Sequence, residues 1–297
     1  MKNYPRKIVI SGQTHGNEWT GTYVIHHLKS LNLNEDYPKL DILLLLANPK
    51  SFENNRRYVD QDLNRSFGQD TESHILKTYE LWRAKEIQNE IDAFANGEQV
   101  FILDLHTTTA NMGSSIVMHD VSPENISLFS YMKHINDKTK AYAWIEPKAL
   151  NFLNSLSTYG FAIEVGPIAH NTLTSQIYDQ TLEAVHSVLT FLNGPETASS
   201  HIKKEETVYC FKENIDYPRN EFGDLLAMIA PEFQNLNFET IEKGQAIFET
   251  FEQKKIAIDE LVGFAPVFIN EAAYYEKGIA FTLTKKEKFP SKLLPSG

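Results

Sequence analysis

The sequence contains one cysteine, Cys210, in 297 residues. A single thiol excludes an intrachain disulfide framework, and it is typical of proteins that work in a reducing compartment. Residues 1–6 also contain no long apolar segment of the kind found in secretory signals. We therefore expect a cytoplasmic protein.

Long apolar runs and positive charge are also scarce. The longest apolar run, Ile42–Ala47, is far too short to cross a bilayer, so we expect no membrane partner. The chain carries 39 acidic and 28 basic residues, a formal net charge of -11, which argues against a nucleic-acid partner. The sequence leaves the oligomeric state open, a homo-oligomer included.

Short apolar runs alternate with longer amphipathic segments as far as residue 195. Runs rich in Val, Ile and Leu predict strands at Lys7–Ser11, Leu40–Ala47, Gln99–Leu105, Ser115–Met118 and Phe161–Val165. Apolar residues three or four apart predict helices at Gly21–Leu31, Ser73–Asn96 and Thr172–Phe191. The alternation indicates an α/β fold in which helices flank a parallel or mixed sheet. In such sheets, functional groups gather beyond the carboxyl ends of the strands.

A stretch of small and polar residues at 193–200 indicates a domain boundary. We expect one domain over residues 1–195 and a smaller, β-rich C-terminal domain over residues 202–290. The strands predicted for the second domain are Thr207–Phe211, Gln245–Phe248, Lys255–Ile258 and Ile279–Leu283. The last segment, Lys285–Gly297, is expected to be frayed.

The stretch Gln13–Glu18 follows the first predicted strand and contains a histidine and a glutamate three positions apart. His15 and Glu18 can converge on one metal ion if the loop between them turns tightly. We expect Gly12 and Gly16 to give the backbone the freedom for such a turn. The pair is a weak signal by itself, because a surface histidine beside a capping glutamate has the same spacing.

Two further strand ends carry groups with metal or acid–base chemistry. Asp104 and His106 share one face of their strand because side chains alternate with a period of two. His106 completes a His/Glu/His set, and three protein ligands with an open fourth position are typical of a catalytic zinc ion. Glu164 is a carboxylate inside an apolar strand, where it serves either as a general base or as half of a structural ion pair.

The polar loop at residues 55–65 has two interpretations that the sequence does not separate. It is either a solvated loop or an anion-binding loop, in which an arginine pairs with a carboxylate or stabilises an oxyanion. A nucleotide site is not favoured. The stretch Gly16–Gly21 has the glycine spacing of a P-loop, but Thr22 and Tyr23 stand where that motif requires Lys and Ser or Thr.

The sequence resembles the aspartoacylase/succinylglutamate desuccinylase family of zinc carboxypeptidase-like hydrolases, and its aspartoacylase members most of all. Seven motifs carry the resemblance, in the same order and over nearly the whole chain. They are G-Q-T-H-G-N-E-W-T-G (12–21), A-N-P (47–49), R-Y-V-D-Q-D-L-N-R (57–65), D-L-H-T-T-T-A-N-M-G (104–113), I-E-V-G-P (163–167), D-Y-P-R (216–219) and P-V-F-I-N-E-A-A-Y-Y-E-K (266–277).

The resemblance implies a carboxypeptidase-like α/β domain, a β-rich domain that narrows the site entrance, and a role for each matching residue. One zinc ion per chain would be bound by His15, Glu18 and His106, with Asp62 behind His15. Water would be activated by Glu164. The remaining roles are oxyanion stabilisation by Arg57, and substrate binding by Asn64, Arg65 and Tyr274.

The activity implied by the resemblance is hydrolysis of the amide bond of a small N-acyl amino acid. The leading substrate is N-acetyl-L-aspartate, which would give acetate and L-aspartate. This chain has Leu150 and Asn154 where the family's acidic-substrate pocket has Tyr and Arg, and it has Asn214 where the family has Lys before D-Y-P-R. Lys148 is the nearest cation to the first two positions. Loss of an arginine that pairs with a carboxylate costs about 1.5–3 kcal/mol if nothing replaces it.

These departures favour an alternative substrate class, N-acyl amino acids with neutral or aromatic side chains. A carboxypeptidase acting on peptides is a second alternative, which the extra β-rich domain makes less favourable. A zinc-binding module without catalysis is an alternative of a different class.

Overall fold

The computed structural model describes residues 4–68, 78–145, 151–274 and 276–292. Within them, a nine-stranded mixed sheet runs through the whole molecule in the order β11-β12-β7-β5-β4-β6-β3-β1-β2. Its strands are β1 (Lys7–Gly12), β2 (Asp41–Leu46), β3 (Val100–Thr107), β4 (Gly113–Met118), β5 (Lys140–Ala143), β6 (Tyr159–Gly166), β7 (Glu205–Asp216), β11 (Ala265–Val267) and β12 (Ile279–Pro290). The predicted α/β class with a mixed sheet is confirmed.

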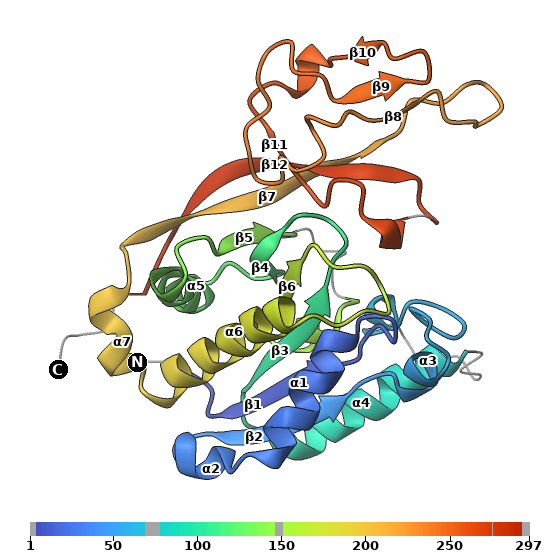
Figure 1. Ribbon diagram of the computed structural model, residues 1–297. Coiled ribbons are helices and arrows are strands. Elements are labelled where there is room, and N and C mark those ends of the chain that lie inside the picture. The colour runs from blue at the N-terminus through green and yellow to red at the C-terminus, as the bar shows by residue number, and fades with distance from the viewer. Residues whose placement is uncertain (1–3, 69–77, 146–150, 275, 293–297) are drawn as a thin grey trace.

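Helices cover both faces of the N-terminal part of this sheet (Figure 1). The helices of this part are α1 (Trp19–Ser30), α2 (Leu33–Asp36), α3 (Pro49–Glu53), α4 (Tyr79–Ala95), α5 (Pro123–Ile135), α6 (Ser175–Asn193) and α7 (Pro195–Ala198), of which α1, α5 and α6 pack on one face and α4 on the other. Alternation along β1 shows how the two faces are filled. Ile8 and Ile10 belong to the core cluster that includes residues of α1, α5 and α6, whereas Val9 belongs to the cluster that includes residues of α4. Both faces of β1 are therefore apolar, as expected for a strand with helices on both sides.

The central strands position the candidate site. Strands β2, β1, β3 and β6 are parallel neighbours, and β4 pairs with β6 in the antiparallel direction. The carboxyl ends of β1, β3 and β6 consequently meet at one edge of the sheet. His15 follows β1, while His106 and Glu164 lie near the ends of β3 and β6.

The C-terminal part is joined to the same sheet by two long antiparallel strands. β7 and β12 pair along their lengths, from Asp216 opposite Ile279 to Glu205 opposite Pro290. β7 also pairs in parallel with β5, so the sheet continues from one part of the molecule to the other. Figure 1 shows these two strands, gold and red, above α5 and α6. The prediction that Lys285–Gly297 is frayed is wrong as far as Pro290, because these residues form ladder hydrogen bonds with β7.

A small antiparallel sheet lies beyond these strands, in the order β10-β9-β8. It consists of β8 (Ala227–Ile229), β9 (Phe248–Thr250) and β10 (Lys255–Ile256). The strand predicted at Gln245–Phe248 begins three residues later, and the one predicted at Lys255–Ile258 ends at Ile256. The β-rich character of this part is confirmed. Its irregular segments include two short turns of 3-10 helix, η4 (Asp259–Leu261) and η5 (Ala272–Tyr274).

Several other boundaries differ from the sequence prediction. The helix predicted from Ser73 begins at Tyr79, because Thr78 is extended and its side chain accepts a hydrogen bond from Leu81 N. Residues 69–77 lie outside the described part. The predicted linker at 193–200 contains the end of α6, the short helix α7 and the first residues of a 3-10 turn, η3 (Ser199–His201). α5 and β5 were not predicted.

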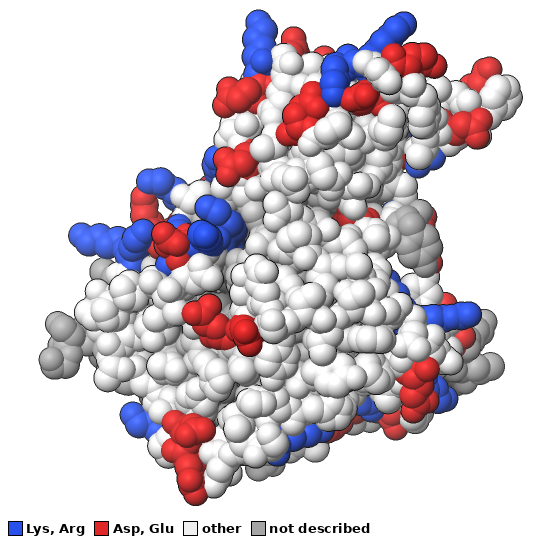
Figure 2. Space-filling model, viewed as in Figure 1, with Lys and Arg blue, Asp and Glu red and all other residues white. Residues whose placement is uncertain are grey.

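On the face shown in Figure 2, acidic and basic side chains lie interspersed on the C-terminal part, and much of the surface over α1 and α6 carries no charge. Among the residues that the structure describes, no helix combines the length and apolar character needed to cross a membrane.

Candidate active site

The loop between β1 and α1 brings His15 and Glu18 together. Gln13 adopts a left-handed backbone conformation with φ +69° and begins the turn. Gly12 and Gly16 have a different role from the predicted one, because they allow close packing. A Cβ at Gly16 would lie 2.2 Å from Phe52 N, and one at Gly12 would lie 2.4 Å from Gly21 O. The tight loop therefore depends on close backbone approach at the glycines and on unusual torsions at Gln13.

His15, Glu18 and His106 converge on one point, and all three are buried. Glu18 Oε1 lies 2.7 Å from His15 Nδ1, Glu18 Oε2 lies 3.0 Å from His106 Nδ1, and the two Nδ1 atoms are 3.1 Å apart. Ligands of a tetrahedral zinc ion are separated by about 3.4 Å, given zinc–nitrogen bonds near 2.1 Å. The three residues therefore form a metal-binding set of the right composition and size.

Two carboxylates fix the orientation of the imidazole rings. Asp62 Oδ1 lies 3.0 Å from His15 Nε2, and Asp104 Oδ2 lies 2.7 Å from His106 Nε2. Asp104 is fully buried, and its other oxygen accepts a hydrogen bond of 2.7 Å from Thr14 Oγ1. When each Nε2–H donates to its carboxylate, each Nδ1 lone pair faces the other, as metal-ligating histidines require.

This arrangement favours a cation at the centre of the set. With both rings neutral and their Nε2–H groups bonded, the two Nδ1 lone pairs and the Glu18 carboxylate face one point, where no hydrogen lies between them. Burial opposes a charged His106, but Asp104 and Glu18 outweigh it and raise the pKa of His106 well above its usual range. A divalent cation would supply the missing positive charge, and the donor atoms fit zinc.

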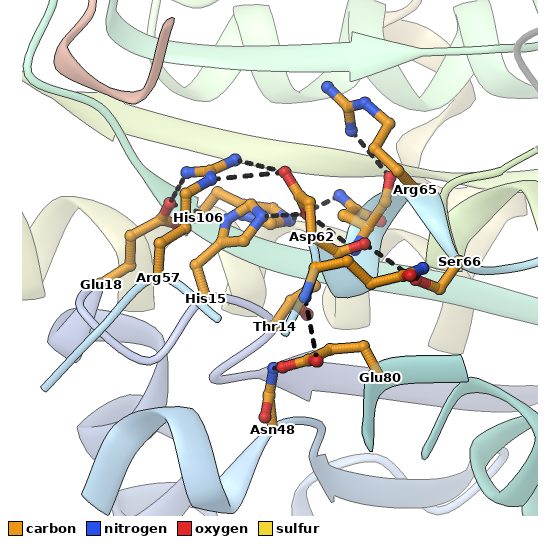
Figure 3. A network of polar contacts seen from close by, with 12 residues as sticks. Thr14, His15, Glu18, Asn48, Arg57, Asp62, Arg65, Ser66, Glu80 and His106 are labelled. Carbon is orange, nitrogen blue, oxygen red and sulfur yellow. Dashed lines mark hydrogen bonds and ion pairs between the residues drawn. The ribbon is translucent and has the colours of Figure 1, made fainter. Parts of the chain in front are cut away.

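Arg57 lies beside the metal-binding set and pairs with two of the carboxylates there. Its Nη1 donates to Glu18 Oε1 at 3.1 Å, while its Nε and Nη2 donate to Asp62 Oδ2 at 3.3 and 3.2 Å. Figure 3 shows the guanidinium between these two carboxylates, beside the His15 ring. Burial opposes the charge, but Asp62 and Glu18 outweigh it and raise the pKa of Arg57. The loop thus holds a fixed positive charge beside the metal-binding set.

The loop that carries Arg57 is held from below by Glu80, a fully buried carboxylate on α4. Glu80 accepts hydrogen bonds from the backbone nitrogens of Val59, Asp60 and Gln61, and from Asn48 Nδ2. Glu80 was not predicted as a site residue, although an acid on the buried face of a helix is a signal that it has a partner.

Glu164 lies beside the metal-binding set on the neighbouring strand. It is the register partner of His106 across β3 and β6, and it lines the same pocket. Its Oε2 atom is buried and makes no hydrogen bond to the described residues. Burial is the largest cause that raises the pKa of Glu164 to about 8, and Glu18 and Glu271 add to it. The alternative of a structural ion pair is not supported, because no described cation lies within salt-bridge distance of Glu164.

Asn64, Arg65 and Tyr274 all line the pocket next to this set. The Asn64 Oδ1 atom accepts a hydrogen bond of 2.8 Å from Leu153 N, which ties the Arg57 loop to the segment before β6. The Arg65 guanidinium lies over the Phe152 ring, 4.6 Å from its centroid. Tyr274 comes from η5 in the C-terminal part, and burial raises its pKa to about 12. The structure therefore brings every predicted site residue to one pocket.

The wall of the pocket beyond the metal-binding set is mostly apolar and aromatic. Its members include Val117, Met118, Tyr142, Trp144 and Phe152. His119 and Asn154 also line it and are hydrogen-bonded to each other, with Asn154 Nδ2 3.1 Å from His119 Nδ1. His119 Nε2 lies 2.8 Å from Ser157 O, and burial lowers its pKa. His119 is thus a neutral hydrogen-bonded group, and no motif in the sequence predicted its place in the pocket wall.

The positions where this chain departs from the family motifs have different surroundings. Asn154 is buried in the pocket wall, whereas Leu150 and Lys148 lie outside the described residues. Asn214 lies on β7, where its Oδ1 accepts a hydrogen bond from Thr282 Oγ1, and it is not among the pocket-lining residues described.

Glu271 connects the C-terminal part to the loop that follows His106, a contact that sequence analysis missed. Its Oε2 accepts hydrogen bonds from the backbone nitrogens of Thr109 and Ala110 and from the Thr108 hydroxyl. Its Oε1 accepts from Ala273 N. Glu271 therefore fixes η5, and with it Tyr274, over the pocket.

Two family models match the chain. The succinylglutamate desuccinylase/aspartoacylase catalytic domain matches residues 4–192, and the AstE/AspA barrel-sandwich hybrid domain matches residues 204–286. A protein named probable aspartoacylase from Trichodesmium erythraeum is 40% identical over 290 residues, covering 95% of this chain and 97% of the relative. A human protein named N-acyl-aromatic-L-amino acid amidohydrolase (carboxylate-forming) is 30% identical, covering 98% and 94%.

Among solved structures, that of murine aminoacylase 3 is similar, with a TM-score of 0.85 and 29% sequence identity, covering 99% of this chain and 100% of the other. The resemblance inferred from the sequence motifs is therefore confirmed. The chain belongs to the succinylglutamate desuccinylase/aspartoacylase family, as an amidohydrolase with a buried His-Glu-His metal-binding set.

Proposed function

We propose that the protein hydrolyses the amide bond of small N-acyl amino acids with one zinc ion per chain. His15, Glu18 and His106 would hold the ion. A bound zinc ion supplies Lewis acidity to the scissile carbonyl and makes water more acidic. Glu164 and the metal-binding set belong to residues 1–195, whereas Tyr274 is contributed by the β-rich unit that we place at residues 202–290.

Glu164 is proposed as the group that moves the proton. As a carboxylate it takes a proton from the attacking water, whose oxygen bonds to the acyl carbon. It then gives that proton to the amino nitrogen as the carbon–nitrogen bond breaks, which releases a carboxylic acid and a free amino acid. Its Oε2, beside His106, makes no hydrogen bond to any described residue, which supports this role because the carboxylate oxygen is available to accept a proton.

Arg57, Asn64, Arg65 and Tyr274 are proposed to position the substrate and stabilise charge. The Arg57 guanidinium would donate to the oxygen that becomes negative when water attacks. Arg65, with Asn64 beside it, would bind the α-carboxylate of the amino acid, since a planar guanidinium matches a carboxylate. The Tyr274 hydroxyl remains protonated at neutral pH and can donate a hydrogen bond to substrate.

The preferred side chain of the substrate is proposed to be neutral, and aromatic in particular. The observation that carries this preference is the neutral His119–Asn154 pair in a wall of Tyr142, Trp144 and Phe152. Of the described residues that line the pocket, the arginines and lysines are Arg57 and Arg65. Both already have tasks in the proposed mechanism, so among the described pocket residues no further arginine or lysine is left to pair with a second substrate carboxylate.

N-acetyl-L-aspartate is the second candidate substrate, and the names of relatives such as the Trichodesmium protein support it. Steady-state kinetics of the zinc-loaded protein with N-acetyl derivatives of Phe, Tyr, Leu, Asp and Glu separates the two candidates. We expect kcat/KM for N-acetyl-L-phenylalanine to exceed that for N-acetyl-L-aspartate at least tenfold. A preference for the aspartate derivative would reject the neutral pocket and restore the second candidate.

A further inference from the structure

A second cavity of about 370 Å³ adjoins the active-site pocket, whose own volume is about 90 Å³. Arg57 and Ala273 line both spaces, so the two adjoin at these residues, and Arg57 is the residue proposed to contact the scissile carbonyl. Tyr58 and Ala272 line the second cavity only. The turn η5 carries Ala272 and Ala273. In Figure 1 it is the short red turn above the edge of the sheet where β1, β3 and β6 end.

Two polar side chains of the second cavity have atoms without hydrogen-bond partners among the described residues. Asn17 is 9% exposed, and its Oδ1 is buried without a partner. His170 Nε2 is likewise buried without a hydrogen bond, and it lies 3.8 Å from Glu271 Oε1. Buried polar atoms are almost always satisfied by protein groups, ordered water or a ligand, so these two atoms can take hydrogen-bond partners from within the cavity.

The proposed function gives the direction in which substrate would extend. Asn64 and Arg65 line the active-site pocket but not the second cavity, so the amino acid would occupy the pocket. The carbonyl would lie at Arg57, where the two spaces meet. The acyl chain would then continue past Arg57 into the second cavity. An acetyl group is too short to reach beyond that point, which leaves the second cavity empty in the leading substrates.

We propose that the second cavity is an acyl-group site that accepts chains longer than acetyl and ending in an uncharged polar group. This inference rests on the proposed amide hydrolysis. A carboxamide end can donate to and accept from Asn17 and His170. A carboxylate end would lie near Glu271, and Arg57 is already paired with Glu18 and Asp62. Arg56 also lines the second cavity, but it is exposed, so water screens its charge.

The test compares four acyl groups on the amino acid that the N-acetyl panel finds best. They are acetyl, butanoyl, 4-amino-4-oxobutanoyl and succinyl. We expect kcat/KM for the 4-amino-4-oxobutanoyl derivative to exceed that for the butanoyl and succinyl derivatives at least tenfold. In H170F, which keeps a ring but loses the nitrogens, the advantage over butanoyl should fall at least fivefold.

Ala272→Leu adds bulk at the exposed rim of the second cavity without changing a residue that lines the active-site pocket. It should lower kcat/KM for 4-amino-4-oxobutanoyl and butanoyl substrates at least tenfold and leave the acetyl substrate within twofold. Ala169→Leu is the matched control, an exposed alanine of the His170 loop that lines neither space, and it should change nothing. Thermal unfolding of both variants checks that they are folded.

Two results of the substrate comparison would overturn the inference: a tenfold preference for acetyl over every longer chain, or a preference for succinyl. Two results with the variants would also overturn it. These are an H170F variant that keeps the full advantage of the carboxamide over butanoyl, and equal losses on all substrates in Ala272→Leu. The proposed function survives each of them, because the acetyl substrate is still hydrolysed. Absence of hydrolysis for all four acyl groups would overturn both.

Discussion

His106 on β3 and Glu164 on β6 are register partners in two parallel strands. Neighbouring strands lie about 4.8 Å apart, and paired residues face the same side of the sheet. The strand pairing by itself therefore places the candidate base beside a metal ligand, without help from any loop. Loops supply the rest of the site, including Glu18, Arg57 and Tyr274.

In the metal-free protein, the free energy of unfolding should depend on pH because the Glu164 carboxyl is held away from water. Its pKa is raised from 4.5 to about 8 in the folded state, so the folded protein binds more protons than the unfolded chain between these values. Stability therefore falls as pH rises through this window. Glu164→Gln removes the titration, so the metal-free variant should be more stable than wild type by a few kcal/mol at pH 8.

Denaturant unfolding at pH 5 and pH 8, in the presence of a chelator, measures this difference. The variant and wild type should differ little at pH 5, and the gap should widen toward pH 8. If the difference in free energy of unfolding between variant and wild type is the same at pH 5 and pH 8, then Glu164 is ionised throughout this range in the metal-free protein.

Asp104 should control metal affinity through His106. Asp104→Asn weakens the acceptor that fixes the His106 ring, and loss of such a partner typically lowers metal affinity 10–100-fold. Competition with a chromophoric chelator measures the dissociation constant. Glu206→Gln is the control, because Glu206 is also a buried acid but contacts Ser130 and Lys133 away from the site. It should leave zinc affinity unchanged. Equal zinc affinity in Asp104→Asn and wild type would contradict the role of Asp104.

Arg57 and Arg56 are adjacent in sequence but should differ sharply in their effect on rate. Arg57→Lys loses the planar fork that bonds Glu18 and Asp62, and it displaces the charge meant for the oxyanion. We expect kcat to fall about 10²–10³-fold with a smaller change in KM. Arg56→Lys, at an exposed position, should keep kcat within twofold. If Arg57→Lys and Arg56→Lys change kcat by similar factors, the proposed role of Arg57 in stabilising the oxyanion is wrong.

The strands and helices that carry the site were largely predictable from local patterns. The apolar runs around Val9, Ile102 and Ile163 have the composition of buried parallel strands, and period two put Asp104 on the same face as His106. The extension of β12 to Pro290 was not predictable in this way. Residues 285–288 are four consecutive charged residues without the apolar alternation that predicts a strand, and this end is held by pairing with β7, more than 70 residues away in sequence.

The site residues divide in a similar way. His15 and Glu18 lie three positions apart after a predicted strand, and His106 at a second strand end completes a metal-ligand set, so residue types and spacing indicated these three. The role of Arg57 came only from the family resemblance, because the polar loop at 55–65 by itself has two interpretations. Glu80 and Glu271 act through backbone groups of other segments. An acid on a buried helix face indicates that Glu80 has a partner, but the local pattern does not show which backbone groups either residue contacts. The His119–Asn154 pair belongs to the same class, because two segments 35 residues apart make that wall of the pocket.

Replacement of Glu164 by Gln in the zinc-loaded protein tests the central claim most directly. Gln keeps the shape of the side chain but cannot accept a proton from water. We predict that kcat for the best N-acetyl amino acid falls at least 10³-fold while the protein still binds one zinc ion per chain with wild-type affinity. Turnover within tenfold of wild type, with zinc bound, would contradict the assignment of Glu164 as the base.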